Sequence, residues 1–283
     1  MEQAILLIQC PDQKGIIAKF SNFVFEREAN IISSYQHSTD PDGGRFFMRM
    51  KFVFDNERYP EASLESDIEE LASTLDAVWQ IHYESKVMRM AIAVSRFDHC
   101  LADLLYRVRS GELRVEVPLV VSNHEDAREL VEGHGIAFHY LPVSKETKPE
   151  QEKRFFELIR DSSDFLVLAR YMQVLSEDFL TGYGKDIINI HHSFLPSFMG
   201  ANPYRQAYDR GVKIIGATAH FATSTLDQGP IIDQEVGRVT HKDKVESLKA
   251  KGRDLEKLAL ANAIRMYLEH RVIRYENKTI ILG

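Results

Sequence analysis

Asn189 and His191 place an amide and an imidazole at the end of an apolar run, residues 187–190. Side chains alternate between the two faces of a β-strand, so this pair would point one way and His192 the other. In open α/β sheets, ligands bind where the strands end. An amide that donates to a developing oxyanion, beside an imidazole that moves a proton, predicts attack on a small carbonyl group.

A carboxylate that could complete this site follows 36 residues after His191. Asp227 lies in the turn Leu-Asp-Gln-Gly-Pro, residues 226–230, after a second apolar strand. A carboxylate held in a Gly/Pro turn beside a strand end is well placed for proton transfer. Taken alone, Asn189 and His191 also fit an ordinary strand end, and the added carboxylate is what favours a catalytic site. A metal site is not expected, because ligands on adjacent strand residues diverge.

Composition bounds the class of protein. The 283 residues are 44% hydrophobic and 27% charged, which fits one large globular domain or two smaller ones. A net charge of −7 argues against nucleic-acid binding, which needs a basic face, but still allows a small anionic substrate. Cys10 and Cys100 lack metal-binding spacing and are typical of reduced cytosolic thiols. With no secretion signal and no membrane-length apolar run, we expect a cytoplasmic protein.

Two domains are predicted, residues 1–84 and 85–283. In the first, strands are expected at 3–10, 30–39, 45–54 and 77–83, with helices at 16–28 and 59–75. This βαββαβ order is the ferredoxin-like plan. In the second, strands are expected at 87–95, 117–122, 137–141, 165–169, 187–190, 214–222 and 231–239, and helices at 100–109, 125–132, 149–160 and 244–271. Their alternation predicts an α/β domain with a mainly parallel, doubly wound sheet. The last helix is expected to be an outer helix with a solvated face.

The first domain resembles an ACT domain, in Asp12, Gly15 and Ile16 at the first strand-to-helix turn and in Asn30 at the start of the second strand. ACT domains commonly bind an amino acid at that turn and pair through sheet edges or helices. The resemblance therefore implies an amino-acid effector at these four residues and a homo-oligomer, either dimer or tetramer. A domain that only assembles subunits fits equally, because the tight turn needs Gly15 in either case.

The second domain resembles the formyltransferases that use 10-formyltetrahydrofolate. The similarity covers about residues 87–283 and includes the Asn189-Ile-His191 pair, the segment that follows it, and Asp227 in its Gly/Pro turn. An ACT domain in front of such a domain is the arrangement of the formyltetrahydrofolate deformylases, and the doubled His191-His192 is similar to that branch. The resemblance implies a Rossmann-like fold with Asn189, His191 and Asp227 as catalytic residues. It also implies a folate substrate, with neither cofactor nor metal.

The same resemblance implies where the folate would bind. Seven further residues are expected to contact it: His99, Leu168, Arg170, Tyr171, Met172, Gly200 and Ser224. The backbone of residues 168–172 would meet the pterin edge, although Tyr171 and Met172 could equally be apolar residues that anchor the loop. Arg170, Lys185 and Arg205 are candidates for the glutamate tail of the folate.

The turn at residues 95–99 bears on the acceptor of the formyl group. A sugar-phosphate acceptor would need a Gly-rich turn after the first strand of this domain, where backbone amides hold phosphate. Here the turn reads Ser-Arg-Phe-Asp-His, without glycine and with an acidic residue. Water is then the simplest nucleophile, and hydrolysis would release formate for purine synthesis and balance the folate pools. Transfer to an amine and a non-enzymatic sensor stay as alternatives. Whether His191 or Asp227 is the base stays open.

Overall fold

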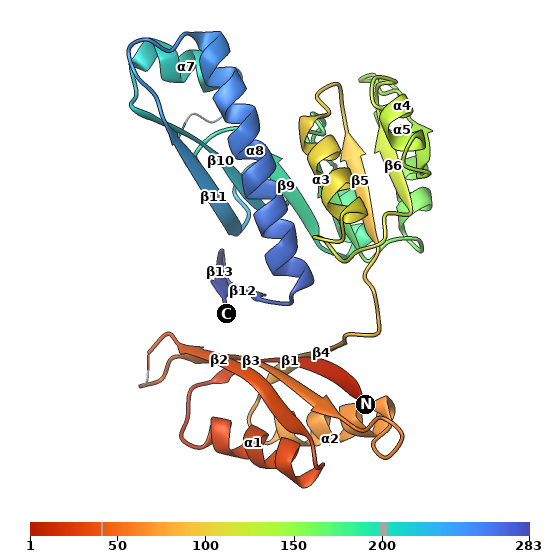
Figure 1. Ribbon diagram of the computed structural model, residues 1–283, viewed down its shortest axis with the longest axis vertical. Coiled ribbons are helices and arrows are strands. Elements are labelled where there is room, and N and C mark those ends of the chain that lie inside the picture. The colour runs from red at the N-terminus through yellow and green to blue at the C-terminus, as the bar shows by residue number, and fades with distance from the viewer. Residues whose placement is uncertain (41, 198–202) are drawn as a thin grey trace. The chain divides into compact units, whose positions relative to one another are not determined.

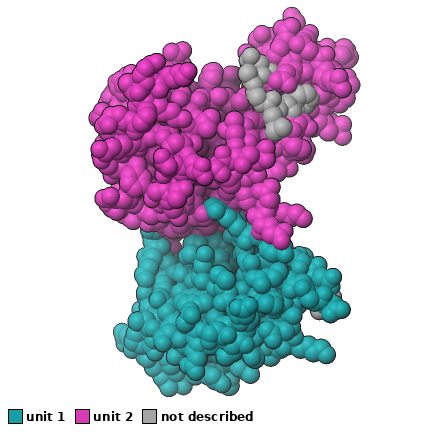
Figure 2. Space-filling view, turned by 180° about the vertical axis from the view of Figure 1, so that it is seen from behind, with its two compact units in different colours: residues 1–87, 269–275, 280–283 teal, residues 88–268, 276–279 magenta. Residues whose placement is uncertain are grey.

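The computed structural model of the chain describes residues 1–40, 42–197 and 203–283. They form two compact units, coloured separately in Figure 2. Unit 1 comprises Met1–Val87 with Glu269–Tyr275 and Ile280–Gly283, and unit 2 comprises Met88–Leu268 with Glu276–Thr279. The sequence predicted a single cut after residue 84, whereas contacts group most of the C-terminal segment with unit 1. Among the described residues, no helix is long and apolar enough to cross a membrane.

Unit 1 has the expected βαββαβ order, which confirms the ferredoxin-like plan. Its elements are β1 (Glu2–Pro11), α1 (Ile16–Glu26), β2 (Asn30–Ser38), β3 (Arg45–Phe54), α2 (Glu61–Ser73) and β4 (Val78–Tyr83). The sheet is antiparallel, in the order β2-β3-β1-β4, and both helices lie on one side of it (Figure 1). Buried Phe20 and Ile68 from the two helices share one core with Leu6 and Phe52 from the sheet.

The C-terminal segment differs from the prediction. The last helix, α8 (Val245–Leu268), ends before Arg271, and a ribbon of β12 (Val272–Tyr275) and β13 (Lys278–Ile281) follows. His270 and Glu276 adopt positive φ of 51° and 54°, which stops the helix and forms the ribbon turn. Single residues in the left-handed region leave almost no signal in a helical pattern, so the predicted helix runs three residues past its observed C-terminal end.

Within unit 1, the start of this segment is held by polar contacts. Arg49 donates to the backbone oxygens of Glu269, at 2.9 Å, and His270, at 3.1 Å. The ring of His270 stacks on that of His82 with centroids 3.6 Å apart and planes 7° from parallel. Glu269 and His270 are thus tied to β3 and β4 of unit 1.

Unit 2 is a seven-stranded sheet in the order β11-β10-β9-β8-β5-β6-β7. The strands are β5 (Met90–Val94), β6 (Leu119–Ser122), β7 (Ala137–Tyr140), β8 (Phe165–Leu168), β9 (Ile187–His191), β10 (Ile214–Phe221) and β11 (Ile231–Arg238). Strands β5 to β9 are parallel, while β10 and β11 are antiparallel, so the expected mainly parallel sheet is confirmed. The remaining helices are α3 (His99–Arg109), α4 (Arg128–Glu132), α5 (Lys148–Ile159), α6 (Glu177–Tyr183) and α7 (Pro203–Arg210).

The strand order fixes where a ligand can enter unit 2. The chain runs from β5 outwards to β6 and β7, then returns to place β8 and β9 on the other side of β5. Connections therefore leave in opposite directions from the ends of β5 and β8, and such a reversal opens a crevice at the carboxyl ends of the strands. All five residues of β5 and all four of β8 are buried, which explains their unbroken apolar runs.

Candidate active site

Strand β9 presents Asn189 and His191 on the same face, at the end where the crevice opens. Its antiparallel partner β10 sets His220 opposite Asn189 and Thr218 opposite His191. His191 is 6% exposed and His220 is 2% exposed, so two imidazoles and an amide meet in a nearly dry environment. Electrostatic and hydrogen-bonding effects are stronger there than in water.

Asp227 closes this group from the loop between β10 and β11. Its Oδ2 lies 3.2 Å from Nδ1 of His191, and its Oδ1 lies 3.7 Å from Nε2 of His220. The loop approaches β10 closely at Gly229, where a Cβ atom would stand 1.8 Å from the backbone oxygen of Phe221. Only glycine allows that approach, so the Gly/Pro turn predicted from the sequence holds Asp227 against the two histidines.

The environment of Asp227 keeps it ionised. Burial acts to raise the pKa of this carboxyl, but the contacts with His191 and His220 outweigh burial and hold the pKa below its usual range. An ionised carboxylate accepts the Nδ1–H of His191 and fixes that tautomer. The other ring nitrogen, Nε2, has no hydrogen-bond partner among the described residues and is the atom that can accept a proton.

His220 orients the amide of Asn189, a role that the sequence did not suggest. Its Nδ1 lies 2.9 Å from the backbone oxygen of Phe221 and must donate to it. In the neutral ring Nε2 is then an acceptor, and Nδ2 of Asn189 lies 3.1 Å from it. One N–H of the amide is thereby fixed, and the second remains for a ligand. The available signal was the alternation Thr218-Ala-His220 at the end of the strand that precedes Asp227.

These groups open into a cavity of about 1210 Å³ in unit 2. Nine of the ten residues predicted for catalysis or folate binding line it: His99, Leu168, Arg170, Tyr171, Met172, Asn189, His191, Ser224 and Asp227. The tenth, Gly200, lies outside the described residues. Leu175 and Leu226 also line the cavity and provide apolar surface of the kind a flat ring system requires.

The loop after β8 is held from both sides. Nε2 of Gln151 donates to the hydroxyl of Tyr171, whose ring packs edge-on against Phe155, so Tyr171 anchors the loop. Burial raises the pKa of Tyr171 to about 12, and the hydroxyl stays protonated. The backbone N–H of Met172 donates to Oγ of Ser95, and the Met172 side chain is 53% exposed on the cavity wall. Ser95, from the glycine-free turn, thus supports the loop.

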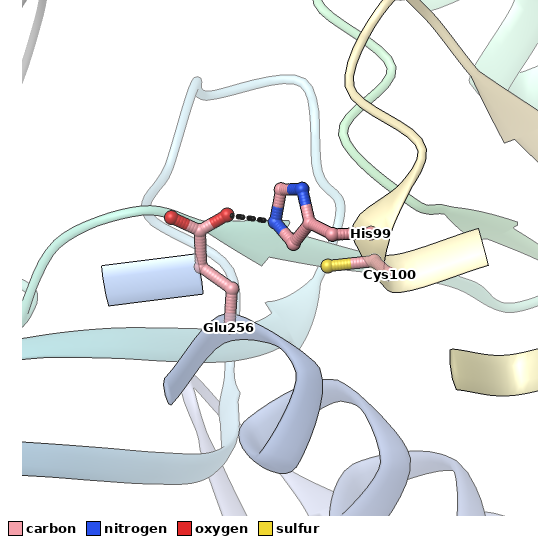
Figure 3. A group of neighbouring side chains, drawn as sticks. All are labelled: His99, Cys100 and Glu256. Atoms are coloured by element: carbon pink, nitrogen blue, oxygen red, sulfur yellow. Dashed lines mark hydrogen bonds and ion pairs between the residues drawn. The ribbon is translucent and has the colours of Figure 1, made fainter. Parts of the chain in front are cut away.

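Glu256 of α8 is a buried carboxylate that the sequence did not predict, because α8 was expected to have a solvated face. It is 1% exposed, and its Oε2 lies 2.8 Å from Nε2 of His99. Figure 3 marks this contact with a dashed line. Its other oxygen accepts from the hydroxyl of Tyr204 at 2.6 Å, and Nε of Arg170 lies 3.3 Å away. Burial opposes ionisation of Glu256, but the contacts with His99, Arg170 and Tyr204 outweigh it and lower its pKa.

Cys100 joins this cluster but does not make it a good metal site. The ligand atoms of His99, Cys100 and Glu256 lie within 4.8 Å of one another. Figure 3 shows the three side chains as neighbours. However, burial raises the pKa of the Cys100 thiol, whereas metal binding needs the thiolate. The Arg170 cation beside Glu256 would also repel a metal ion. The cluster is better described as a buried ion-pair network.

His192 lies nearer the site than the alternation of strand residues predicts. Strand β9 ends at His191, so the two-residue period stops there. The His192 ring lies 5.2 Å from that of His191 and 6.1 Å from that of Tyr204, and it lines the same cavity. Burial, together with the charges of Arg170 and His191, lowers the pKa of His192 to about 4. His192 is therefore neutral near pH 7.

The predicted effector residues of unit 1 fall into two groups. Gly15 has a φ of 89° at the start of α1, and Ile16 is buried beside it. Asp12, in the same turn, accepts a hydrogen bond from the hydroxyl of Ser38 at the end of β2. Asn30 pairs with residue 53 of β3, whereas the turn lies beside residue 44. Nine residues of strand separate the two places, about 30 Å at roughly 3.4 Å per residue. One chain alone does not bring Asn30 to the turn.

Comparisons with known proteins identify the family of each domain. Residues 88–264 match the formyl transferase family and residues 4–73 match the ACT domain. The chain is 50% identical to a formyltetrahydrofolate deformylase of Synechocystis, over 99% of this chain and 98% of that protein. It is also 50% identical to one of Bacillus subtilis, over 98% and 93% of the two chains.

Solved structures show the same likeness. A formyltetrahydrofolate deformylase from Pseudomonas syringae superposes with a TM-score of 0.93 and 42% identity, covering 100% of this chain and 95% of that one. Glycinamide ribonucleotide transformylase 1 from Symbiobacterium toebii matches with a TM-score of 0.66 and 28% identity, covering 71% of this chain and 97% of that one. The deformylases therefore match both units of this chain, whereas the transformylase matches only part of it.

Proposed function

The chain belongs to the formyltetrahydrofolate deformylase family, and we propose that it hydrolyses 10-formyltetrahydrofolate to formate and tetrahydrofolate. The observation that carries the proposal is the contact of Asp227 with both His191, at 3.2 Å, and His220, at 3.7 Å, beside the amide of Asn189. This geometry combines an oxyanion donor, a proton acceptor and an orienting carboxylate in one cavity.

The first chemical step is addition of water to the formyl carbon. The water oxygen forms a bond to that carbon while one of its protons moves to Nε2 of His191, which has no other partner among the described residues. The electron pair of the C=O bond moves to oxygen, and the free N–H of Asn189 donates to the resulting oxyanion. Because Asp227 is held ionised, it is a weak base, and its function is to orient His191 and stabilise the imidazolium.

The second step is collapse of the tetrahedral intermediate. The C=O bond forms again, the bond from carbon to N10 of the folate breaks, and the proton on His191 is delivered to N10. Formic acid loses its remaining proton to solvent, so formate and tetrahydrofolate are the products. His191 acts as the base in the first step and as the acid in the second, so one imidazole carries out both proton transfers.

Formyl transfer needs an amine acceptor, whereas hydrolysis does not, and this difference separates the two functions experimentally. In the expected result, purified protein releases one formate and one tetrahydrofolate per 10-formyltetrahydrofolate, with no amine present. Formyl transfer that occurs only when an amine acceptor is added would overturn the proposal in favour of a transferase. The glycine-free turn at residues 95–98 supports water as the acceptor, because it lacks the backbone approach that a phosphate-bearing acceptor needs.

Such an enzyme would release formate for purine synthesis and balance the one-carbon folate pools in the cytoplasm. It needs no metal or organic cofactor, because the side chains in the cavity supply both the oxyanion donor and the proton acceptor. A hydrolase that discards an activated formyl group benefits from control. We therefore propose that an amino acid linked to one-carbon metabolism, such as glycine or methionine, binds at the ACT turn and changes the activity.

The separation between Asn30 and the turn at Asp12 supports a homo-oligomer in this scheme. The two places lie about 30 Å apart along β3 within one chain. A second copy, related by two-fold symmetry, can bring its own Asn30 to the Asp12 turn of the first. Symmetric dimers of this kind form two equivalent sites. The effector site would then be shared between subunits.

A further inference from the structure

Arg170 is a buried cation whose guanidinium is only partly paired. The residue is 8% exposed, and its Nε lies 3.3 Å from Oε2 of Glu256. Its Nη1 is buried and has no hydrogen-bond partner among the residues that the structure describes. Leaving a charged donor unsatisfied away from water is costly, so the free side of Arg170 calls for an acceptor.

The backbone keeps this side chain on the cavity wall. Arg170 has a φ of 64°, a left-handed conformation that residues with a Cβ rarely adopt. The preceding Ala169 donates to the backbone oxygen of Ala93, and Met172 donates to Oγ of Ser95, so the turn is fixed on both sides. Strain of this kind persists where the surrounding structure enforces it, and it is common at ligand sites.

Glu256 cannot satisfy the whole guanidinium. Its Oε1 accepts from the hydroxyl of Tyr204, and its Oε2 lies within 2.8 Å of His99 as well as 3.3 Å from Arg170. One carboxylate thus serves three groups. A guanidinium carries five N–H donors in a planar fork, so part of its donor set remains for another acceptor.

A chain of contacts joins Arg170 to the catalytic imidazole. Glu256 accepts from Tyr204, the Tyr204 ring lies 6.1 Å from that of His192, and His192 lies 5.2 Å from His191. The charge of Arg170 also acts on His192. All of these residues line one cavity.

We propose that Arg170 binds the carboxylate of the formate that hydrolysis releases, and so forms a product subsite beside the catalytic groups. The proposal rests on the function proposed above. A planar fork suits a small planar carboxylate, which can accept two parallel N–H bonds. The folate glutamate tail is the other carboxylate of the reaction. That tail needs access to solvent, and Arg205, whose side chain is 65% exposed on the same cavity, suits it better than buried Arg170.

Formate binding can be measured without turnover, by titrating ¹³C-formate into the unliganded protein and following the formate NMR linewidth. We expect saturable binding to the wild type. Arg170→Gln should weaken it roughly ten- to hundredfold, the loss typical of a charge-assisted hydrogen bond. The matched control is Arg205→Gln, which should leave formate affinity unchanged. Equal formate affinity in wild type and Arg170→Gln would overturn the proposal.

Two further measurements keep the test decisive. If Arg170→Gln does not fold, Arg170→Lys takes its place, since lysine retains the charge but lacks the planar fork. Arg170→Lys should bind formate several-fold more weakly than the wild type. KM is also compared for substrates with one and three glutamates. A KM increase in Arg170→Lys that grows with tail length, with unchanged formate binding, assigns Arg170 to the tail and refutes the subsite. Formate binding without hydrolysis would reject the proposed function while keeping the carboxylate site.

Discussion

Asn189 and His220 face each other across the antiparallel pair β9 and β10, with Nδ2 of Asn189 lying 3.1 Å from Nε2 of His220. Because Nδ1 of His220 donates to a backbone oxygen, Nε2 of the neutral ring accepts from the amide. The amide therefore cannot flip without losing this bond. Asn189 stands ready to donate to an oxyanion before any substrate arrives, and such preorganisation is the main source of electrostatic catalysis.

Replacing Asn189 by alanine should lower kcat roughly 10²–10³-fold, the usual cost of removing an oxyanion donor. His220→Ala should lower kcat less, with little change in KM, since it acts by positioning Asn189. The double variant should be no slower than Asn189→Ala alone, because the two side chains act as one unit. Multiplicative losses in the double variant, measured by steady-state formate release, would assign His220 an independent role through Asp227.

Asp227→Asn should lower kcat roughly 10²–10⁴-fold, because the amide no longer stabilises a charged His191. Folding lowers the pKa of Asp227 below its unfolded value of about 3.9. Ionised Asp227 therefore stabilises the fold at pH values above about 3.9, and this stabilisation is lost as pH falls through the still lower pKa of the folded state. The rate deficit should therefore be constant between pH 5 and 8. A deficit that disappears towards pH 5 would show that Asp227 itself titrates as the base.

Gly252 of α8 packs against Tyr204, where a Cβ atom would stand 2.0 Å from the hydroxyl. Gly252→Ala should displace Tyr204 from Glu256 and lower the free energy of unfolding by about 1–3 kcal/mol, as overpacking does. Helix propensity alone predicts the opposite sign, a gain of about 1 kcal/mol. The matched control is Gly182→Ala in α6, where the nearest atom lies at 3.6 Å. Denaturant unfolding should show loss in the first variant and no loss in the second.

The stacked pair His82 and His270 should make unit 1 sensitive to acid. Burial lowers the pKa of His82 to about 4 and, aided by the charges of His82 and Arg49, that of His270 to about 3. The unfolded chain, with histidine near 6.5, binds more protons below that pH, so stability should fall as pH drops from about 7 towards 4. His270→Phe keeps a stacked ring and should flatten this slope in thermal unfolding. Exposed His241→Gln should leave it unchanged.

Glycine or methionine should change the rate of formate release in the wild type, and Asp12→Ala should remove that response. Asp42→Ala, an exposed acid in the nearby hairpin, is the control and should respond normally. A flat titration of the wild type with both amino acids would leave unit 1 with an assembly role only.

The shared effector site has its own test. Chains carrying Asp12→Ala and chains carrying Asn30→Ala should each lose the response when alone. Mixed dimers should regain one intact site out of two, and with it part of the response. If mixing restores nothing although subunits exchange, the site does not combine residues of two copies.

Local patterns in the sequence decided most of the fold. Apolar runs and alternation located nearly every strand of both units, because side-chain period and burial are properties of neighbouring residues. The same alternation put Asn189 and His191 on one face, and the Gly/Pro turn marked Asp227. The short helices α6 and α7 and the ribbon after α8 escaped prediction, since few residues and two positive φ values carry little periodic signal.

Only the tertiary structure decided which distant residues meet. The register of β9 against β10 pairs Asn189 with His220, and a shift of one residue would have separated them. The packing of α8 buries Glu256 against Arg170, although Glu256 lies in the charge-rich first half of its helix. Register and helix packing depend on contacts between segments far apart in the chain, so no local pattern encodes them. The sequence by itself determined the chemical groups of the site, and the fold determined their partners and protonation.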